Sequence, residues 1–352
     1  MNQSIWRNAL LLASGITAST ALVVVSLGQI SQQHRNAAAA AAAAAAANRP
    51  YHCVTALATS TSLHAYNNNN NEPIRSYKTP VDDYYSKHKT LPLPSTVHAV
   101  LASDTKQDNT DNTDPERRKN VLVIGDVHGC YEELQLLYQK AVKENHNQDF
   151  EYVILVGDLC NKGPESVKVI QFVRSQSPQW LAVRGNHDDA ALNAALGDKE
   201  RLQKAKYNWI TESRSGHFLT DDDVMWMAEL PYTLRIPAGS LNDSVDTLIV
   251  HAGLIPNTPL EEQFIKDMIT LREVEDESGN SVPWATVYKG PFFVIFGHDA
   301  RRGLQTYEGG CAIGLDSGAC YGGKLTGVIL PNKKIVSVNA LKAHCPINGN
   351  ND

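Results

Sequence analysis

The sequence predicts an α/β domain in which helices lie on the outer faces of β-sheets. Two short apolar runs, at 121–126 and 152–158, are typical of buried strands, and each ends in Gly-Asp. Between them, residues 131–143 carry apolar side chains at helical spacing. The apolar positions of this segment are Leu134, Leu136, Leu137 and Ala141. The second half of the chain is rich in further strand-like runs, so the order is βαβα followed by mostly β.

The other elements follow from similar patterns. Pro164 begins a second helix, in which Val167, Ile170 and Val173 share one face. Residues 181–189 form a third strand and turn. The strands expected in the second half lie at 248–253, 292–299, 311–318, 324–331 and 334–340.

Composition and charge restrict the class of function. The chain has 352 residues, a formal net charge of −6 and a pI of about 6.1, which provides no electrostatic footprint for nucleic acid. A local cluster of cations or metals must therefore hold any anionic substrate. Six cysteines in a chain of this length, without a CxxC pair, are neither a disulfide framework nor a zinc finger. We expect incidental free thiols, with a Cys311–Cys320 bridge as the alternative in an oxidising lumen.

The N-terminal segment, 1–30, is predicted to be a membrane anchor or a signal segment. The stretch from Ala9 to Gly28 has no charge and would span roughly 30 Å as a helix. Arg7 precedes it and Arg35 follows it, which favours a cytosolic N-terminus and a luminal catalytic domain in a single-pass protein. A cleaved signal peptide on a secreted protein, a mitochondrial presequence and an apolar tail without function are the alternatives.

Residues 31–118 are predicted to be a disordered, low-complexity linker. They contain an eleven-alanine run (Ala37–Ala47) and an asparagine run (Asn67–Asn71), which bury too little apolar surface to offset backbone ordering. The catalytic domain is then expected at 119–345, with a short tail at 346–352.

Metal-binding side chains follow five of the predicted strands. At each place an apolar run stops, glycine or alanine forms a turn, and an Asp, Asn or His appears. The set is Asp126, His128, Asp158, Asn186, His187, His251 and His298. A single histidine after a strand is usually a core or surface residue, but five such sites in one chain are not a coincidence. Oxygen and imidazole ligands suit divalent Mn, Zn, Fe or Co, so the sequence predicts a centre for such ions.

Two such ions about 3.5–4 Å apart suit phosphoryl transfer. A carboxylate that bridges them would hold a bridging hydroxide, which attacks phosphorus in line while the ions neutralise the equatorial oxygens. A protonated imidazole would then give its proton to the leaving oxygen.

The ordered motifs GDVHG, GD…KG, RGNHD, VHAG and GH resemble those of calcineurin-like metallophosphoesterases, and among them the phosphoprotein-phosphatase superfamily. The resemblance covers about residues 119–331. It implies a β-sandwich flanked by α-helices, with the site at the strand ends. It also implies the role of each motif residue. Asp126 and His128 would hold the first metal, Asp158 would bridge, Asn186, His251 and His298 would hold the second, and His187 would be the general acid.

The second motif departs from the protein-phosphatase pattern, because it reads GDLCNKGP. Asn161 replaces the Asp that would orient the catalytic histidine, and Lys162 replaces a phosphate-binding Arg. This version, together with the strings at 289–305 and 314–331, resembles the ApaH-like branch. Members of that branch act on polyphosphate, dinucleoside polyphosphates, RNA caps and phosphoproteins. One is a membrane-anchored, zinc-dependent fungal vacuolar endopolyphosphatase, which makes a vacuolar location an expectation here.

An amide at position 161 cannot raise the pKa of His187 by its charge. Asp188 or Asp189 could replace the missing carboxylate. Alternatively, the acid could be less needed because phosphoanhydrides have good leaving groups, which favours polyphosphate or dinucleotide substrates.

Three cations are predicted to contact substrate phosphate: Lys162, Arg184 and Arg272. Arg184 could instead brace its loop, and Arg272 could lie on a helix surface. The function expected from these residues is a two-metal phosphatase acting on phosphoanhydrides or phosphate monoesters, as a polyphosphatase or ApaH-like phosphatase. A serine/threonine phosphoprotein phosphatase and a catalytically inactive metal-binding scaffold are the alternatives.

Overall fold

A computed structural model describes residues 93–101, 119–212, 216–241, 243–307 and 309–346 of the chain. The predicted membrane segment at 1–30 and most of the predicted linker lie outside these residues. Within the described part of the chain, no helix has the length and apolar character needed to cross a membrane.

One sheet has five strands, three of which are parallel neighbours. Its order is β13 (Lys334–Asn339), β12 (Lys324–Leu330), β2 (Val121–Ile124), β3 (Tyr152–Leu155) and β4 (Trp180–Ala182). Strands β2, β3 and β4 are parallel, and β12 runs antiparallel to both β2 and β13. Every residue of β2 is buried, as its uninterrupted apolar sequence predicts for a central strand.

The other large sheet has six strands and also contains three parallel neighbours. Its order is β1 (His98–Val100), β5 (Thr233–Ile236), β6 (Thr247–Val250), β9 (Phe293–Phe296), β11 (Ala312–Gly314) and β10 (Gln305–Thr306). Strands β6, β9 and β11 are parallel. The hairpin β7 (Glu273–Glu275) and β8 (Ser281–Pro283) is separate.

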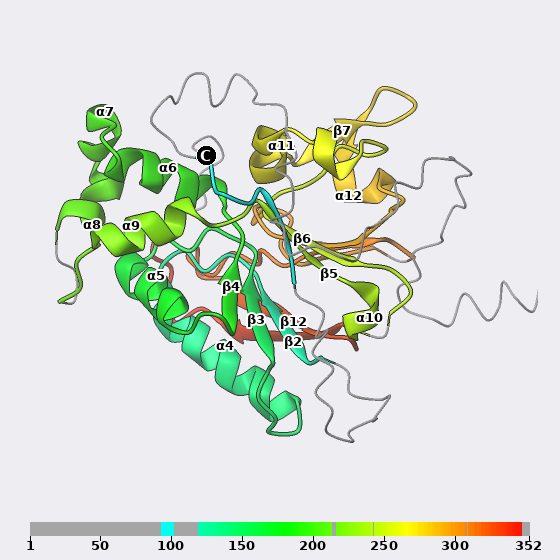
Figure 1. Ribbon diagram of the computed structural model, residues 1–352, viewed down its shortest axis with the longest axis horizontal. Coiled ribbons are helices and arrows are strands. Elements are labelled where there is room, and N and C mark those ends of the chain that lie inside the picture. The colour runs from blue at the N-terminus through cyan, green and yellow to red at the C-terminus, as the bar shows by residue number, and fades with distance from the viewer. Residues whose placement is uncertain (1–92, 102–118, 213–215, 242, 308, 347–352) are drawn as a thin grey trace, which may run out of the picture. The chain divides into compact units, whose positions relative to one another are not determined.

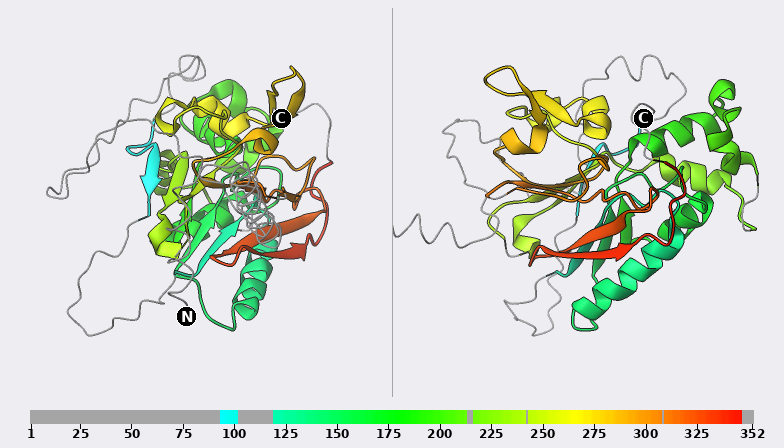
Figure 2. Two further views of the ribbon diagram at one scale, coloured as in Figure 1. Left: turned by 90° about the vertical axis from the view of Figure 1, so that its right-hand side faces the viewer. Right: turned by 180° about the vertical axis from the view of Figure 1, so that it is seen from behind.

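The two large sheets form two layers with helices outside them (Figures 1 and 2). The longer helices are α4 (Tyr131–Glu144), α5 (Ser166–Ser175), α6 (Asn186–Ala195) and α9 (Asp221–Ala228). The short ones are α7 (Lys199–Leu202), α8 (Asn208–Thr211), α10 (Ala238–Leu241), α11 (Ile265–Thr270) and α12 (Trp284–Val287), with 3-10 turns at Ala205–Tyr207 and Leu260–Glu262. The predicted α/β sandwich with flanking helices is thereby confirmed.

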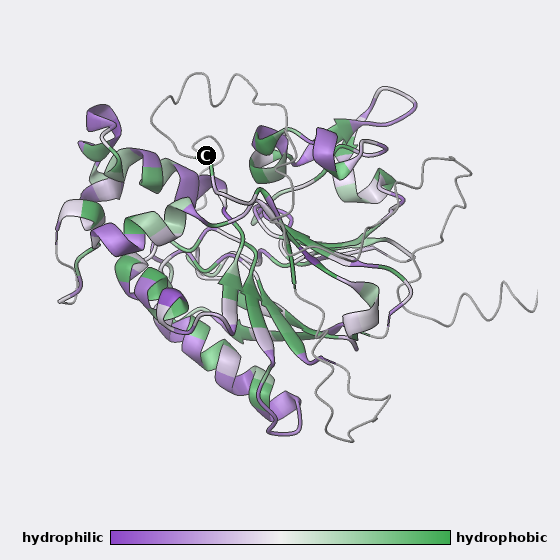
Figure 3. Ribbon diagram, viewed as in Figure 1, coloured by the Kyte–Doolittle hydropathy of each residue, from purple (hydrophilic) through white to green (hydrophobic). Residues whose placement is uncertain are grey.

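Helix α4 packs with the face that the spacing of its apolar residues predicts. Leu134, Leu137 and Ala141 are buried, as their spacing predicts, whereas Leu136 is 41% exposed and lies off the buried face. Apolar and polar residues alternate along α4, while the strands are largely apolar (Figure 3). The helix therefore covers the five-stranded sheet with one stripe and presents polar side chains to solvent.

Strand β1 lies inside the stretch predicted as linker. Its three residues pair in parallel with β5, and Leu101 N donates to Arg235 O at 2.8 Å. A three-residue strand is too short to produce a recognisable pattern, and its pairing partner lies far along the chain. The ordered domain therefore includes a segment N-terminal to residue 119.

The cysteines differ from the expectation at one position. Cys130, Cys160 and Cys320 are free thiols, whereas Cys311 is disulfide-bonded. Because Cys320 is free, the alternative of a Cys311–Cys320 bridge is wrong.

His98 makes the stability of the domain depend on pH. Burial lowers the pKa of His98 from 6.5 to about 4, partly opposed by Glu261, and its Nδ1 lies 2.8 Å from Thr233 Oγ1. The folded state disfavours protonation of this imidazole. The stability that the neutral His98 side chain contributes is therefore lost as pH falls from about 6.5 towards 4. Between pH 7 and 5 we expect the wild type to lose about 2 kcal/mol more free energy of unfolding than His98→Gln.

Urea denaturation at the two pH values measures this difference. The exposed His146→Gln serves as the control and should lose as much as the wild type. Equal losses in the wild type and His98→Gln would refute the role of His98.

Candidate metal centre

The predicted ligands all follow the carboxyl ends of parallel strands. In the five-stranded sheet, Asp126 and His128 follow β2, Asp158 follows β3 and Asn186 follows β4. In the six-stranded sheet, His251 follows β6 and His298 follows β9. Carboxyl ends of parallel strands lie at one edge of a sheet, and the two edges meet here, as the contacts below demonstrate.

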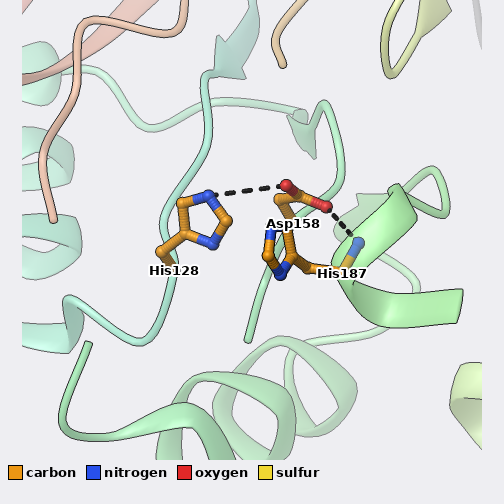
Figure 4. A group of neighbouring side chains, drawn as sticks. All are labelled: His128, Asp158 and His187. Carbon is orange, nitrogen blue, oxygen red and sulfur yellow. Dashed lines mark hydrogen bonds and ion pairs between the residues drawn. The ribbon is translucent and has the colours of Figure 1, made fainter. Parts of the chain in front are cut away.

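Asp158 lies at the centre of the group. One carboxylate oxygen, Oδ2, lies 3.4 Å from His128 Nε2, and the other, Oδ1, lies 3.4 Å from His251 Nε2. Oδ1 also accepts the His187 backbone N–H at 2.9 Å (Figure 4). Two sets of donor atoms are present, and within each set the atoms lie within 4.8 Å of one another. One set belongs to His128, Asp158 and His187, and the other to Asp158, His251 and His298. Asp158 belongs to both sets, as a bridging ligand must.

The proton positions on two imidazoles point to a cation. His128 Nδ1 donates to Cys160 O at 3.0 Å and His251 Nδ1 donates to Val156 O at 2.9 Å. These bonds leave a lone pair on each Nε2, and both lone pairs face the Asp158 carboxylate. Hydrogen-bond acceptors that converge in this way are stabilised by a positive charge, and a carbonyl that orients the far nitrogen is the usual support of a metal-binding histidine.

Asn186 and His298 complete the second set. Asn186 Oδ1 lies 3.0 Å from His251 Nε2, which places another oxygen acceptor against the same lone pair. His298 Nε2 is buried and has no hydrogen-bond partner among the described residues. Burying such a nitrogen without a partner is costly, so His298 fits a ligand role.

Asp126 lies beside a carboxylate that the sequence analysis missed. Both oxygens of Asp126 accept the His298 backbone N–H, at 3.2 and 3.1 Å, and its side chain is hydrogen-bonded to Asp316. Burial, followed by the charge of Asp316, raises the pKa of Asp126 well above its ordinary value. Two buried carboxyl groups in contact either share a proton or lie beside positive charge, which a divalent ion would supply. Asp316 follows β11 between glycines, the same signal that identified the other ligands.

The four histidines are held in the neutral form that binds metals. Burial is the main cause in each case: it lowers the pKa of His251 to about 4 and those of His128, His187 and His298 well below the ordinary value. Lys162 contributes to every one of these shifts by its positive charge.

The backbone at the site is held in unusual conformations. His128, Asp158 and His298 have φ of 47°, 53° and 69°, in the left-handed region that non-glycine residues seldom adopt. Gly297 allows the close approach of Asp126, because a Cβ there would lie 1.9 Å from Asp126 Oδ1. Such local strain accumulates where a function requires it.

His187 is oriented by Asn161 and Trp209. Trp209 Nε1 donates to Asn161 Oδ1 at 2.8 Å, which fixes the amide so that its nitrogen faces His187. Asn161 Nδ2 then lies 3.3 Å from His187 Nδ1 and 3.2 Å from His187 O. Because the amide nitrogen can only donate, His187 Nδ1 accepts and the ring proton resides on Nε2. Trp209 was missed because its contact is with a residue far along the chain.

Neither neighbouring aspartate replaces the missing carboxylate, so that expectation is wrong. Asp188 accepts the backbone N–H groups of Asp158 and Leu159, at 2.8 and 2.9 Å, and thereby holds the metal-binding loop. Asp189 accepts from Arg184 and from Tyr232 OH, at 3.2 and 3.0 Å.

The predicted phosphate-binding cations are placed differently from one another. Lys162 Nζ donates to His128 Nε2 at 3.2 Å and lies 5.1 Å from the centre of the Tyr321 ring, inside the site. Arg272 is partly exposed, and its Nη2 donates to His298 O at 3.3 Å, beside the site. Arg184 is fully buried, and its bonds to Asp189 favour the bracing role over contact with substrate.

Comparisons with known proteins agree with this geometry. The profile of the family described as "Calcineurin-like phosphoesterase" matches residues 119–316, more than half of the chain. The asymmetrical bis(5'-nucleosyl)-tetraphosphatase PrpE of Oceanobacillus iheyensis is 28% identical over 61% of this chain and 90% of its own length. The symmetrical bis(5'-nucleosyl)-tetraphosphatase of Yersinia pseudotuberculosis is 26% identical over 66% and 96%. One crystal structure, provisionally described as that of a diadenosine tetraphosphatase, is similar to this chain, with a TM-score of 0.53 and 30% sequence identity. The match covers 70% of this chain and 98% of the other.

Proposed function

Because the chain belongs to the calcineurin-like phosphoesterase family, we propose that it hydrolyses phosphoanhydride bonds, with dinucleoside polyphosphates as its substrate class. The chain is a metal-dependent hydrolase of phosphate esters or anhydrides. The observation that supports metal-dependent chemistry is the convergence of acceptors on Asp158, whose two carboxylate oxygens face two different imidazole lone pairs. The choice of anhydrides is supported by the relatives and by the amide of Asn161 beside His187.

The chain's own residues fit two ions. Asp126, His128 and Asp158 would hold one, and Asp158, Asn186, His251 and His298 would hold the other, with Mn, Zn, Fe or Co as suitable metals. When bound, two such ions would neutralise charge on the transferred phosphoryl group and make a water molecule more acidic.

His187 suits an easy leaving group. It is neutral and carries its proton on Nε2, so it can give a hydrogen bond to a leaving oxygen but is a weaker acid than imidazolium. A phosphate leaving from an anhydride is more stable as an anion than an alkoxide leaving from an ester. Lys162, whose charge acts on all four histidines, would face the polyphosphate chain.

Asn161→Asp should shift the enzyme towards esters. An aspartate at this position would accept a hydrogen bond from the His187 Nδ1–H group, and its negative charge would raise the pKa of the imidazole. We expect the ratio of kcat/KM for a phosphate monoester to that for diadenosine tetraphosphate to rise at least about tenfold, since general acid catalysis contributes about 100-fold or more where it is needed. Initial rates on both substrates measure the ratio.

Asn208→Asp is the control, because it adds the same charge beside Trp209 without a bond to His187. An unchanged ratio in Asn161→Asp would remove the argument that the amide selects anhydrides.

The proposal is tested by product release from each substrate incubated with the purified full-length chain, measured as nucleotides from diadenosine tetraphosphate, as shortened chains and phosphate from polyphosphate, and as phosphate from a phosphopeptide. Mn, Zn, Co and Mg are supplied in turn, and long-chain polyphosphate, diadenosine tetraphosphate and a phosphopeptide are compared, with Asp158→Asn as control. We expect metal-dependent release that is fastest from diadenosine tetraphosphate. Preference for polyphosphate would favour a polyphosphatase, preference for the phosphopeptide a phosphoprotein phosphatase, and no release at all an inactive scaffold.

We further propose that residues 1–30 anchor the chain in a membrane with the catalytic domain in a lumen, such as that of a vacuole. The support is the uncharged stretch from Ala9 to Gly28 and the cations that flank it. The sequon Asn242-Asp243-Ser244 reports this topology, because only luminal sequons are glycosylated. We expect a mass shift on glycosidase treatment of the chain from its native cells; an unmodified sequon together with recovery in the soluble fraction would contradict the proposal.

A further inference from the structure

A second group of metal-binding side chains lies outside the centre described above. Cys130 Sγ, a carboxylate oxygen of Glu133 and a ring nitrogen of His344 lie within 4.8 Å of one another. Cys130 immediately precedes α4, Glu133 belongs to its first turn, and His344 lies in the segment that follows β13. Two segments of the chain, distant in sequence, therefore bring sulfur, oxygen and nitrogen donors to one place.

The C-terminal segment is fixed against these side chains by its backbone. Leu341 N donates to Glu133 Oε1 at 3.0 Å, and His344 N donates to Cys320 O at 2.8 Å. Cys345 N and Sγ also contact Cys320 O, at 3.3 and 3.8 Å. The imidazole of His344 and the thiol of Cys345 are thus both held next to the loop that contains Cys320.

Glu133 indicates that the group holds a cation. Glu133 is 2% exposed and accepts the Leu341 backbone N–H, and no lysine or arginine of the described residues forms an ion pair with it. A buried carboxylate with one backbone N–H as partner is costly unless positive charge lies close by. The adjacent donors are a thiol and an imidazole. A protonated His344 would neutralise the carboxylate, whereas a metal ion would neutralise it and also bind the sulfur and the ring nitrogen.

We propose that Cys130, Glu133 and His344, with Cys345 as the fourth ligand, bind a structural Zn²⁺ ion. The thiol-containing donor set selects Zn²⁺ over the hard cations Mg²⁺ and Ca²⁺. Around a tetrahedral zinc, donor atoms lie roughly 3.3–3.8 Å apart. The donors of Cys130, Glu133 and His344 already lie within 4.8 Å of one another. Cys345 Sγ, which contacts Cys320 O at 3.8 Å, would join them on metal binding.

This ion would support two loops of the catalytic centre. Cys130 comes directly after the His128-Gly129 turn, and Cys320 follows Asp316 on the loop after β11. Tyr321 pairs with Ala343 in an isolated antiparallel bridge, and its ring lies 5.1 Å from Lys162 Nζ. The C-terminal segment held by zinc would therefore fix the ring against which Lys162 packs.

The two sites are distinguishable because the catalytic ligands include no cysteine. When Co²⁺ replaces Zn²⁺, a cobalt–thiolate bond gives an intense ultraviolet charge-transfer absorption, whereas oxygen and imidazole ligands do not. The absorption thus reports the second site alone, whatever the state of the catalytic centre and whatever the activity.

The test loads the full-length chain, purified under reducing conditions, with Co²⁺. We expect thiolate absorption that saturates at one ion per chain for this site and disappears on addition of Zn²⁺. His344→Gln should weaken Co²⁺ binding, measured by this absorption, at least about tenfold. Glu132→Gln, an exposed neighbour of Glu133 on the same helical turn, should leave it unchanged.

Cys130→Ser changes a fully buried residue and could prevent folding, so the decision rests on His344→Gln, in a partly exposed segment. Absence of thiolate absorption in the wild type would overturn the proposal, as would equal absorption in His344→Gln. Thiol titration that finds Cys130 or Cys345 in a disulfide in the purified chain would also overturn it.

Discussion

Asp158→Asn should reduce the rate of phosphoanhydride hydrolysis by more than about 1000-fold, since a bridging ligand contributes several kcal/mol and each 1.36 kcal/mol is a factor of ten. The substitution keeps the shape of the side chain but removes the charge that faces His128 and His251 at 3.4 Å each. It also replaces one carboxylate oxygen with an amide NH2 group, which donates hydrogen bonds and cannot bind a second metal ion. Initial rates at saturating metal, together with the metal content of the variant, measure the effect.

Asp149→Asn is a matched control, because Asp149 lies on the exposed surface and bonds only to Tyr138 OH at 2.6 Å among the contacts described. It should retain wild-type rates. If Asp158→Asn kept more than about a tenth of the wild-type rate with two ions bound, Asp158 would not be the bridging ligand.

Arg184→Met should destabilise the fold by about 3–5 kcal/mol, because it leaves Asp189 buried without its charged partner. Both side chains are fully buried, and Arg184 Nη1 lies 3.2 Å from Asp189 Oδ1. Burial already raises the pKa of Asp189 to about 6, against the opposing effect of Arg184, so this carboxylate depends on the guanidinium for its charge. Urea denaturation of the metal-loaded chain measures the free energy of unfolding.

The double variant Arg184→Met, Asp189→Leu should recover most of that loss, because it removes both charges together. This pair of measurements also decides between the two roles considered for Arg184. A residue that binds substrate phosphate would instead raise KM and leave the unfolding free energy within about 1 kcal/mol of the wild type.

The sequence was sufficient to predict the strand-end centre. Asp126, Asp158 and His251 each follow an uninterrupted apolar run, and such runs in an α/β chain form parallel strands whose ends meet. Two roles depend on contacts between distant segments. Trp209, which was missed, donates to a residue 48 positions away, and Asp188, which was expected beside His187, instead accepts from Leu159, 29 positions away. No local pattern records such contacts.

Short elements were missed for a related reason. Strand β1 has three residues and gains its order from pairing with β5, so its stability is tertiary and not local. Leu136 of α4 is also decided by tertiary packing. It is apolar and lies within the helical pattern, yet it is exposed and lies outside the buried stripe.

The ligands of the centre come from both large sheets, and this has a consequence for local unfolding. Asp158 belongs to one sheet and His251 to the other, and Asp126 accepts the backbone N–H of His298 across the same boundary. Transient opening of either sheet therefore separates ligands and releases the ions. Bound metal raises the free energy of that opening by mass action. As the metal concentration rises, the hydrogen-exchange rates of amides at the ends of β3 and β6 should therefore fall in parallel. With metal bound, the centre would thus act as a crosslink between the two large sheets.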